Sequence, residues 1–257
     1  MGENHFWVTT VPRTGSMWTF NVVRGLAQMA GRQVHPETVP IDDHSMFEIY
    51  HRATATDHVS QSIYTYKVHG KLGYVLPESK YLTTIRDPRE IIVSFMRFMK
   101  VDFEIAFENV KALKDLVDYY SSFDGNKLLM VNYEDIVSKP VYVVKNIAKF
   151  MNLDATDEMV NKVAANLDPV RVRSNIAMND MMLEVKKEQT GQIDASEVVF
   201  FTDDHYRAFD VKTGFQTGHV SEMTREDYRA GLTKEQVDRI NEYFGDWFER
   251  YGFSREF

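Results

Sequence analysis

Residues 11–18, Val-Pro-Arg-Thr-Gly-Ser-Met-Trp, join a β-branched and aromatic run at residues 6–11 to a helical pattern. The run predicts a strand, and an apolar stripe from Trp18 to Met29, spaced three to four residues apart, predicts a helix. Gly15 permits backbone angles that other residues resist, so the loop can approach a ligand closely. Free amides at the N-terminus of the helix attract anions. The stretch therefore predicts a strand, an anion-binding turn and a helix.

The side chains and amides of this loop supply the donors that an anion needs. The side-chain donors are Arg13, Thr14, Ser16 and Thr19, and the free amides belong to Gly15, Ser16, Met17 and Trp18. An ordinary strand-to-helix turn with a solvent-facing arginine is the alternative, since one glycine turn is a weak signal. The loop lacks the GxxxxGK(S/T) pattern, so the lysine and the magnesium-binding hydroxyl of P-loop ATPases are absent at their usual spacing. This disfavours a phosphotransferase of the P-loop type.

A second anion site is predicted where a strand at residues 81–85 ends. Asp87, Pro88 and Glu90 carry the ordinary signals of a helix start: an N-cap, a first-turn proline and a capping-box acid. Those signals leave Arg86 unexplained, because it follows an otherwise apolar strand. Its planar guanidinium suits a phosphate, and Ser94, about two helical turns further on, can add a hydroxyl.

Other strand and helix signals alternate along the chain. Strands are predicted at residues 6–11, 63–68, 81–85 and 128–131, and helices at 103–120, 141–151 and 157–166, with another beginning at Pro88. One final helix is predicted from the stripe of Val237, Ile240, Phe244, Trp247 and Tyr251. The alternation predicts a single α/β domain over residues 1–257, with a central parallel sheet flanked by helices on both faces. Ligands bind such sheets at the carboxyl ends of the strands.

Composition narrows the classes of function. The 257 residues include no cysteine, which excludes disulfides and a thiol nucleophile and fits a reducing compartment. The formal net charge of −8 argues against general binding to nucleic acid or a membrane surface. Residues 1–11 lack a signal-peptide pattern, and no stretch reaches about 18 consecutive apolar residues, so we expect a cytoplasmic protein. The histidines show no metal-ligand spacing, so no metal is required.

Four motifs, in one order along the chain, resemble the family of sulfotransferases that use 3′-phosphoadenosine 5′-phosphosulfate (PAPS). The family's 5′-phosphosulfate loop, Tyr/Phe-Pro-Lys-Ser/Thr-Gly-Ser/Thr-Thr-Trp, resembles residues 11–18, with Arg13 in place of the lysine and Met17 in place of a hydroxyl residue. Its 3′-phosphate segment, Arg-x-Pro-x-Asp-x-x-x-Ser, resembles residues 86–94. Lys67-Val-His69 is similar to the family's Lys-x-His, and Tyr133-Glu-Asp135 to its Tyr-Glu-Asp. The resemblance covers residues 6–150 well and the remainder loosely.

This resemblance implies a P-loop-like sulfotransferase fold and in-line transfer of a sulfuryl group from PAPS to an acceptor hydroxyl or amine, with release of PAP. It makes His69 the general base. Lys67 and Arg13 become the cations that neutralise charge on the sulfuryl group and the leaving phosphate.

The resemblance also assigns the cofactor site. The loop of residues 13–18 would hold the 5′-phosphosulfate, and Arg86 with Ser94 the 3′-phosphate. Trp18 would stack on adenine and Tyr133 would face the adenosine, although Trp18 equally suits a core position and Tyr133 a strand end. The family's late basic-glycine segment, which closes over the cofactor, is represented in part by Lys212 and Gly214.

Two other functions stay open beside PAPS-dependent transfer. One is magnesium-dependent phosphoryl transfer, and the other is a non-catalytic PAP-binding or nucleotide-binding module derived from a sulfotransferase, which predicts PAP binding without turnover. The acceptor is expected to be a small molecule or a glycan. We expect it to lie between residues 31–62 and 186–222, two polar segments that are predicted to be irregular.

Overall fold

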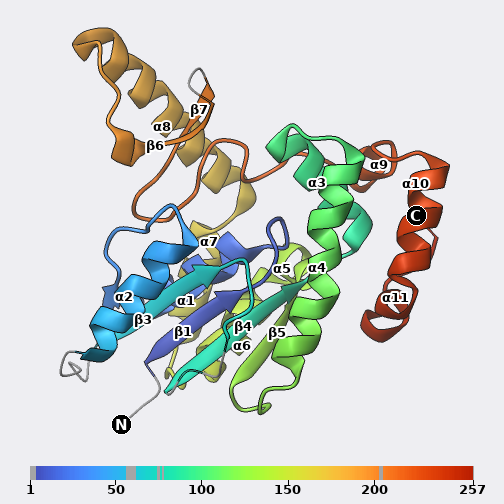
Figure 1. Cartoon of the computed structure of the whole chain (residues 1–257). Coiled ribbons are helices and arrows are strands. Elements are labelled where there is room, and N and C mark those ends of the chain that lie inside the picture. The colour runs from blue at the N-terminus through green and yellow to red at the C-terminus, as the bar shows by residue number, and fades with distance from the viewer. Residues whose placement is uncertain (1–3, 56–61, 74–75, 77, 203–204, 257) are drawn as a thin grey trace.

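The computed structural model describes residues 4–55, 62–73, 76, 78–202 and 205–256. Its centre is a parallel sheet of five strands in the order β2-β3-β1-β4-β5 (Figure 1). The strands are β1 (His5–Thr9), β2 (Gln33–His35), β3 (Ser62–Val68), β4 (Ser79–Ile85) and β5 (Leu128–Asn132). The four predicted strands are confirmed, and β2 is an additional strand at the edge of the sheet.

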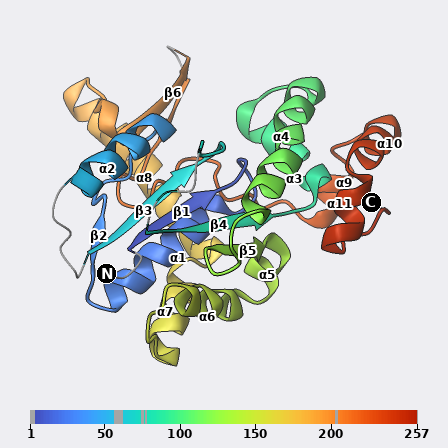
Figure 2. The same ribbon diagram turned by 60° about the horizontal axis from the view of Figure 1, so that its bottom comes forward.

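Helices cover both faces of this sheet, as predicted (Figure 2). One face carries α1 (Ser16–Met29), α6 (Pro140–Phe150) and α7 (Asp157–Asn166), which pack against one another. The other face carries α2 (Asp43–Ala55), α3 (Pro88–Met99) and α4 (Phe103–Ser121), and the short helix α5 (Tyr133–Ser138) follows β5. The helices predicted at residues 103–120, 141–151 and 157–166 are confirmed to within one residue at each end. The predicted start at Pro88 is confirmed, and α1 begins two residues before the Trp18 stripe. Among the described residues, no helix combines the length and the apolar character that crossing a bilayer requires.

Side chains of the strands are buried between these two layers of helices. Every residue of β1 and β4 is buried, and Trp7 and Tyr81 are fully shielded from solvent. The rings of Trp7 and Tyr66, on neighbouring strands, are stacked with their centroids 4.2 Å apart. Continuous burial of this kind is typical of parallel strands that have helices on both faces, which explains why the strands read as apolar runs.

The strand register brings four carboxyl ends to one edge of the sheet. Thr9 at the end of β1 pairs with Val68 of β3, and Ile85 at the end of β4 pairs with Asn132 of β5. The segments that follow these residues carry Arg13, His69, Arg86 and Tyr133.

Residues 31–62 are more regular than predicted. They contain β2 and α2, whose buried side chains Met46, Tyr50 and Ala53 form a single stripe. A narrow stripe among polar residues gives a weak helical pattern, and β2 buries only Val34 of its three residues. The prediction of an irregular segment was wrong for these elements, while residues 56–61 lie outside the described residues.

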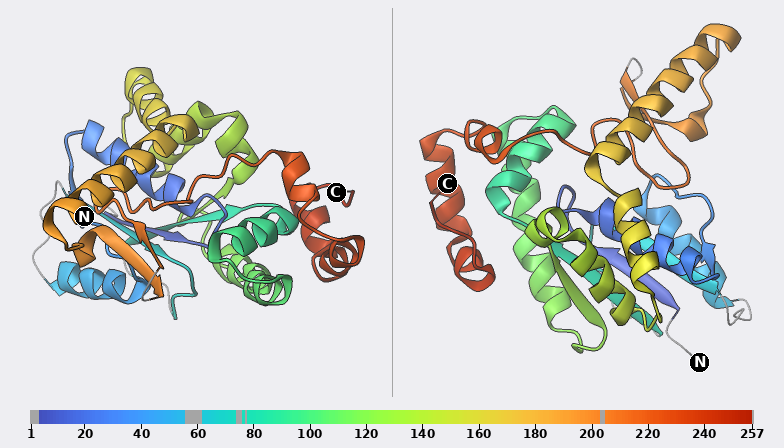
Figure 3. Two further views of the ribbon diagram at one scale, coloured as in Figure 1. Left: turned by 90° about the horizontal axis from the view of Figure 1, so that it is seen from above. Right: turned by 180° about the vertical axis from the view of Figure 1, so that it is seen from behind.

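Residues 186–222 are also partly regular. Helix α8 (Pro169–Thr190) extends into this range and packs against β7 (His205–Ala208), which pairs with β6 (Val198–Thr202) in an antiparallel hairpin. Figure 3 shows α8 and this hairpin projecting away from the central sheet. The irregular backbone that was predicted occurs mainly in residues 209–222, which lead from the hairpin to α9 (Arg225–Arg229).

The final helix predicted from one apolar stripe is two helices in the structure, α10 (Lys234–Tyr243) and α11 (Gly245–Tyr251). The chain leaves helical geometry at Phe244, whose φ and ψ are −100° and 17°. The stripe nevertheless faces the core, because Ile240, Phe244 and Trp247 are buried on both sides of the break. The periodicity therefore predicted the buried face correctly and the continuity of the helix wrongly.

Candidate active site

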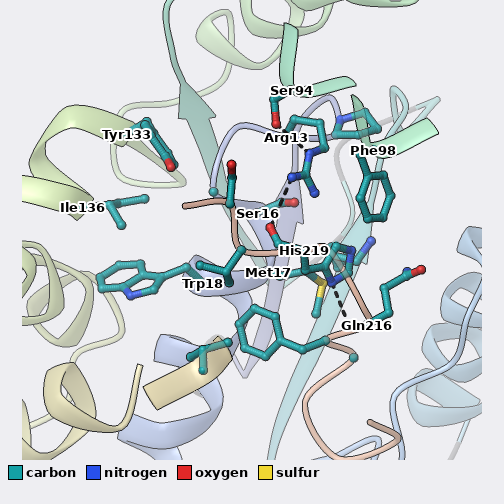
Figure 4. A pocket seen from close by; sticks show the side chains of 18 of the residues that line it. Arg13, Ser16, Met17, Trp18, Ser94, Phe98, Tyr133, Ile136, Gln216 and His219 are labelled. Carbon is teal, nitrogen blue, oxygen red and sulfur yellow. Dashed lines mark hydrogen bonds between the residues drawn. The ribbon is translucent and has the colours of Figure 1, made fainter. Parts of the chain in front are cut away.

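A cavity of about 520 Å³ lies at the carboxyl edge of the sheet (Figure 4). Its walls come from the loop after β1, the ends of β3, β4 and β5, helix α3, and residues 209–221, here called the strap. The predicted site residues that line it are Arg13, Gly15, Ser16, Met17, Trp18, Lys67, His69, Arg86, Ser94, Tyr133 and Gly214. Residues as far apart in sequence as Arg13 and Gly214 therefore share one cavity.

The loop after β1 has a backbone that favours glycine. Gly15 has a φ of 97° in the left-handed region, and a Cβ added there would lie 2.9 Å from Cδ1 of Ile136 and 3.1 Å from Cδ2 of Tyr133. Any side chain at this position would be strained and would collide with the cavity wall. Arg13 also has a positive φ, of 71°, which turns the chain sharply before the helix.

Thr14 stabilises this loop from inside and does not line the cavity. Its side chain is fully buried, and its Oγ1 lies 2.9 Å from the carbonyl oxygen of Val11 and 2.5 Å from Oγ1 of Thr84. The prediction that this hydroxyl contacts the anion directly has no support from its position. The threonine holds the loop against β4 instead.

The N-terminus of α1 faces the cavity without a side-chain cap. Gly15 occupies the N-cap position, and the first turn contains no acidic residue. The partial positive charge of the helix end is therefore available to a ligand. Ser16, Met17 and Trp18 of this turn line the cavity, and Trp18 also packs against the hydrophobic core, while its stacking on adenine stays a prediction.

Arg13 connects the loop to α3 and to the strap. Its Nε donates to Oγ of Ser94 at 3.0 Å, and its Nη2 donates to the carbonyl of His219 at 3.2 Å. The guanidinium carbon lies 4.3 Å from the ring centroid of Phe98. Burial, with a further contribution from Arg86, lowers the pKa of Arg13 to about 10, so the side chain is still a cation at neutral pH.

Arg86 is a second, buried guanidinium at the end of β4. Its Nη1 donates to the carbonyl of Arg13 at 2.9 Å, and its Nε lies 3.1 Å from Oε2 of Glu90. Its guanidinium carbon lies 3.9 Å from the ring centroid of Tyr133 and 4.9 Å from that of Tyr228. These contacts hold the guanidinium in one orientation at the cavity wall.

Lys67 and His69 form a pair at the end of β3. The ring nitrogen Nδ1 of His69 lies 2.9 Å from the carbonyl of Thr10, which can only accept, so Nδ1 carries the proton. The unprotonated Nε2 lies 2.9 Å from Nζ of Lys67 and accepts from the ammonium. Burial, assisted by the charge of Lys67, lowers the pKa of His69 to about 3. His69 is therefore a neutral base, and its lone pair is bonded to the lysine.

The strap lies against α1 through its backbone. Nδ2 of Asn21 donates to the carbonyl of Thr213 at 2.8 Å, and Nη2 of Arg24 donates to the carbonyl of Lys212 at 3.3 Å. Gly214 has a φ of 72°, and a Cβ there would lie 2.7 Å from Cε of Met17. Gly214 thus permits the close approach that brings the strap onto the loop.

Lys212 differs from its predicted place, because its side chain is exposed and does not line the cavity. Only its backbone takes part in docking the strap, through the bond from Arg24. A direct contact between this lysine and the cofactor therefore has no support from the geometry.

Several cavity residues were not found from the sequence. Phe98, His219 and Tyr228 line the cavity, and Asn21 and Arg24 position the strap. Arg24 had a detectable signal in the sequence, since it is a charged residue among the apolar residues of a predicted helix. In the structure it is only 4% exposed. His219 had none, because a single histidine in a polar segment is ordinary.

The charges of the cavity favour an anion. Arg13, Lys67 and Arg86 line it, and of the described residues that line it only Asp168 carries a carboxylate. That carboxylate caps α8 by accepting from the amides of Val170 and Arg171. Within the described part of the chain, no three His, Asp or Glu side chains are grouped to hold a metal ion.

The sulfotransferase domain family matches residues 3–252 of the chain. The chain belongs to the sulfotransferase family. A search of curated proteins found no match to this sulfotransferase.

Solved structures agree with this fold. Retinol dehydratase, in complex with androsterone and the inactive cofactor PAP, superposes with a TM-score of 0.63 at 13% identity, over 96% of this chain and 81% of the other. Mouse sulfotransferase SULT7A1 complexed with PAP gives a TM-score of 0.63 at 15% identity, over 96% and 84% of the two chains. Retinol dehydratase with retinol and PAP gives 0.61 at 13% identity, over 96% and 82%. At identities of 13–15%, these similarities show only that the folds are alike.

Proposed function

We propose that this sulfotransferase transfers a sulfuryl group from PAPS to a hydroxyl or amine of a small, largely apolar acceptor and releases PAP. The observation that carries the proposal is the meeting, in one cavity, of two guanidinium groups, an uncapped helix N-terminus and a lysine–histidine pair. PAPS presents an anion at each end of its adenosine, and the cavity offers donors for both.

In this proposal the cofactor spans the loop after β1 and the start of α3. The amides of residues 15–18 and Arg13 bind the 5′-phosphosulfate, while Arg86 and Ser94 bind the 3′-phosphate. Trp18 and Tyr133 contact the adenosine between these two groups. The structures of retinol dehydratase and mouse SULT7A1 contain PAP on the same fold, which supports a nucleotide of this class.

His69 acts as the general base of the transfer. Its Nε2 takes the proton from the acceptor hydroxyl while the hydroxyl oxygen forms a bond to sulfur. The bond between sulfur and the bridging phosphate oxygen breaks, and its electron pair stays on that oxygen, which leaves with PAP. Arg13 and Lys67 stabilise the charge that develops on the transferring group and on the leaving oxygen.

The bond between Lys67 and His69 must break before His69 can act. Nε2 of His69 accepts from Nζ of Lys67 at 2.9 Å, so the same lone pair cannot also accept from an acceptor hydroxyl. An anionic sulfuryl group offers the ammonium a stronger partner than a neutral imidazole. Binding of PAPS therefore draws Lys67 to the sulfuryl group and frees His69 for the acceptor.

The walls of the cavity favour an apolar acceptor over a glycan. The apolar side chains among them include Val39, Ile41, Phe98, Met99, Val199, Phe209, Phe215 and Val220. Binding of a hydrocarbon acceptor to such walls is favourable by about 25 cal/mol for each Å² of apolar surface removed from water. A glycan would bury its hydroxyls there without partners, which is costly.

The test is transfer from radiolabelled PAPS to a panel of apolar hydroxyl compounds, namely 2-naphthol, androsterone and retinol. We expect label in an organic-soluble product with at least one compound, and loss of that product with His69→Gln. Tight PAP binding without transfer to any acceptor, including hydrophilic sugars, would instead indicate a non-catalytic PAP-binding module.

A further inference from the structure

A second histidine, His219 of the strap, lies within the group of cations that surrounds the proposed transfer site. It lines the same cavity as Lys67 and His69, and Figure 4 shows its ring beside the side chain of Arg13. The ring is stacked with Phe98, with centroids 5.2 Å apart and planes 15° apart. The guanidinium of Arg13 also packs on the ring of Phe98. Phe98 therefore positions both the imidazole of His219 and the cation that is proposed to bind the sulfuryl group.

The hydrogen bonds of His219 define its tautomer. Its Nδ1 lies 3.0 Å from the backbone nitrogen of Gln216, which can only donate, so Nδ1 carries the lone pair. Burial, with further contributions from Arg13 and Lys67, lowers the pKa of His219 well below its ordinary value, so the ring is neutral. A neutral ring with a free Nδ1 carries its proton on Nε2. No acceptor for this Nε2–H is found among the residues that the structure describes.

The two histidines of the cavity therefore have opposite tautomers. His69 is protonated on Nδ1 and presents a lone pair on Nε2, which suits it to take a proton. His219 is protonated on Nε2 and presents a donor, which suits it to hold an oxygen. The carbonyl of His219 accepts from Arg13 at 3.2 Å, so the backbone of the same residue is tied to the loop.

We propose that Nε2–H of His219 donates a hydrogen bond to an oxygen of the sulfuryl group of bound PAPS. The inference rests on the proposed function, because it takes the sulfuryl group to lie between Arg13, Lys67 and His69. A neutral donor adds to the binding of sulfuryl oxygens without adding another charge to a site that already holds several cations.

The test compares PAPS with PAP, since only PAPS carries the sulfuryl group. Calorimetric titrations are made with the unaltered protein, with His219→Phe, which keeps the stacking on Phe98, and with His219→Gln, whose amide retains a donor. We expect His219→Phe to bind PAPS about 10-fold more weakly, as for one lost hydrogen bond to a charged group, with PAP affinity unchanged within about 2-fold. His219→Gln should recover most of the PAPS affinity.

Equal weakening of PAPS and PAP in His219→Phe would overturn the inference, because it would mean that the residue merely supports the strap. No weakening of either nucleotide would overturn it as well. Absence of PAP binding by the unaltered protein would contradict the proposed function itself, so the two failures are distinguishable.

A spectroscopic measurement distinguishes a direct contact between His219 and the sulfuryl group from a role of His219 in supporting the strap. Nitrogen NMR of protein labelled at histidine reports the tautomer of each ring. We expect a ring protonated on Nε2 that is lost in His219→Phe, and an Nε2 resonance that shifts on addition of PAPS but not of PAP. The same shift with both nucleotides would contradict a bond to the sulfuryl group.

Discussion

Replacement of Arg86 by alanine separates the two anion sites. Arg86 is 3% exposed, and its guanidinium donates to the carbonyl of Arg13 at 2.9 Å as well as to Glu90 at 3.1 Å. Under the proposed function it therefore has two roles: it would present a cation to the 3′-phosphate, and it supports the loop proposed to receive the 5′-phosphosulfate. A nucleotide with a 3′-phosphate is weakened by the loss of the cation and by the loss of loop support, whereas a nucleotide without it is weakened only by the loss of loop support.

The expected loss can be worked out from these bonds. A hydrogen bond to a charged group contributes about 1.5–3 kcal/mol, so loss of the 3′-phosphate contact weakens PAP about 10- to 150-fold. The lost bond to the Arg13 carbonyl loosens the loop and weakens PAP and 5′-AMP by the same factor, which cancels in the ratio of their affinities. The ratio of PAP to 5′-AMP affinity, measured by calorimetry, therefore isolates the 3′-phosphate and should fall at least about 10-fold.

Glu90 provides the matched control. Arg86→Ala alone leaves the carboxylate of Glu90, only 13% exposed, without its partner. The measurement is therefore repeated with Glu90→Gln and with Arg86→Ala/Glu90→Gln, which restores charge balance. Glu90→Gln alone should keep or increase PAP affinity, because Arg86 no longer shares its charge. An unchanged PAP to 5′-AMP ratio in both Arg86 variants would refute the assignment of Arg86 to the 3′-phosphate.

Three further outcomes are expected. Gly15→Ala forces a Cβ to 2.9 Å from Ile136 at a φ of 97°, so PAP affinity and melting temperature should both fall, and unchanged values would refute the close approach. His69 is protonated in the unfolded chain near pH 6.5 but in the folded chain only near pH 3, so folded stability is lost as pH falls below 6.5. Between pH 7 and pH 5 the contribution of His69 to this loss should be about 2 kcal/mol, measured by denaturant titration as the difference between the unaltered protein and His69→Gln, because the lowered pKa of His219 contributes in the same direction in both. Lys212→Ala should leave PAP affinity within about 2-fold, since a lost charged contact would cost at least about 10-fold.

Much of the fold could be predicted because its signals are local. A strand, a glycine and a helical stripe are adjacent in residues 6–29, and they correspond to β1, the loop and α1. Asp87 accepts from the amide of Arg89 at 2.9 Å, as the N-cap signal predicts. Signals of this kind depend on neighbours in sequence, so no tertiary information is needed to interpret them.

The site was predicted to the extent that its motifs follow strands. Parallel strands bring their carboxyl ends together, so Arg13, His69 and Arg86 meet although the motifs are far apart in sequence. The direction in which a side chain points was less predictable. Thr14 faces the core and Lys212 faces solvent, and neither difference is visible in a loop pattern.

The resemblance pointed to Lys212 and Gly214, but the path of the strap could not be predicted because long-range contacts define it. Its path depends on backbone carbonyls that accept from Asn21 and Arg24 of α1, and backbone acceptors leave no trace in sequence. The role inferred for His219 depends on the amide of Gln216 and on Phe98, which lies 121 positions earlier. Such a constellation is recognisable only in three dimensions.

The most direct test of the account is calorimetric titration of the unaltered protein with PAP, 5′-AMP and ATP in the presence of EDTA. The account predicts tight PAP binding without metal, and binding of 5′-AMP and ATP that is weaker by at least about 10-fold, as expected for a lost charged contact. Equal affinity for the three nucleotides, or binding that requires magnesium, would contradict a PAPS site built from these two anion-binding segments.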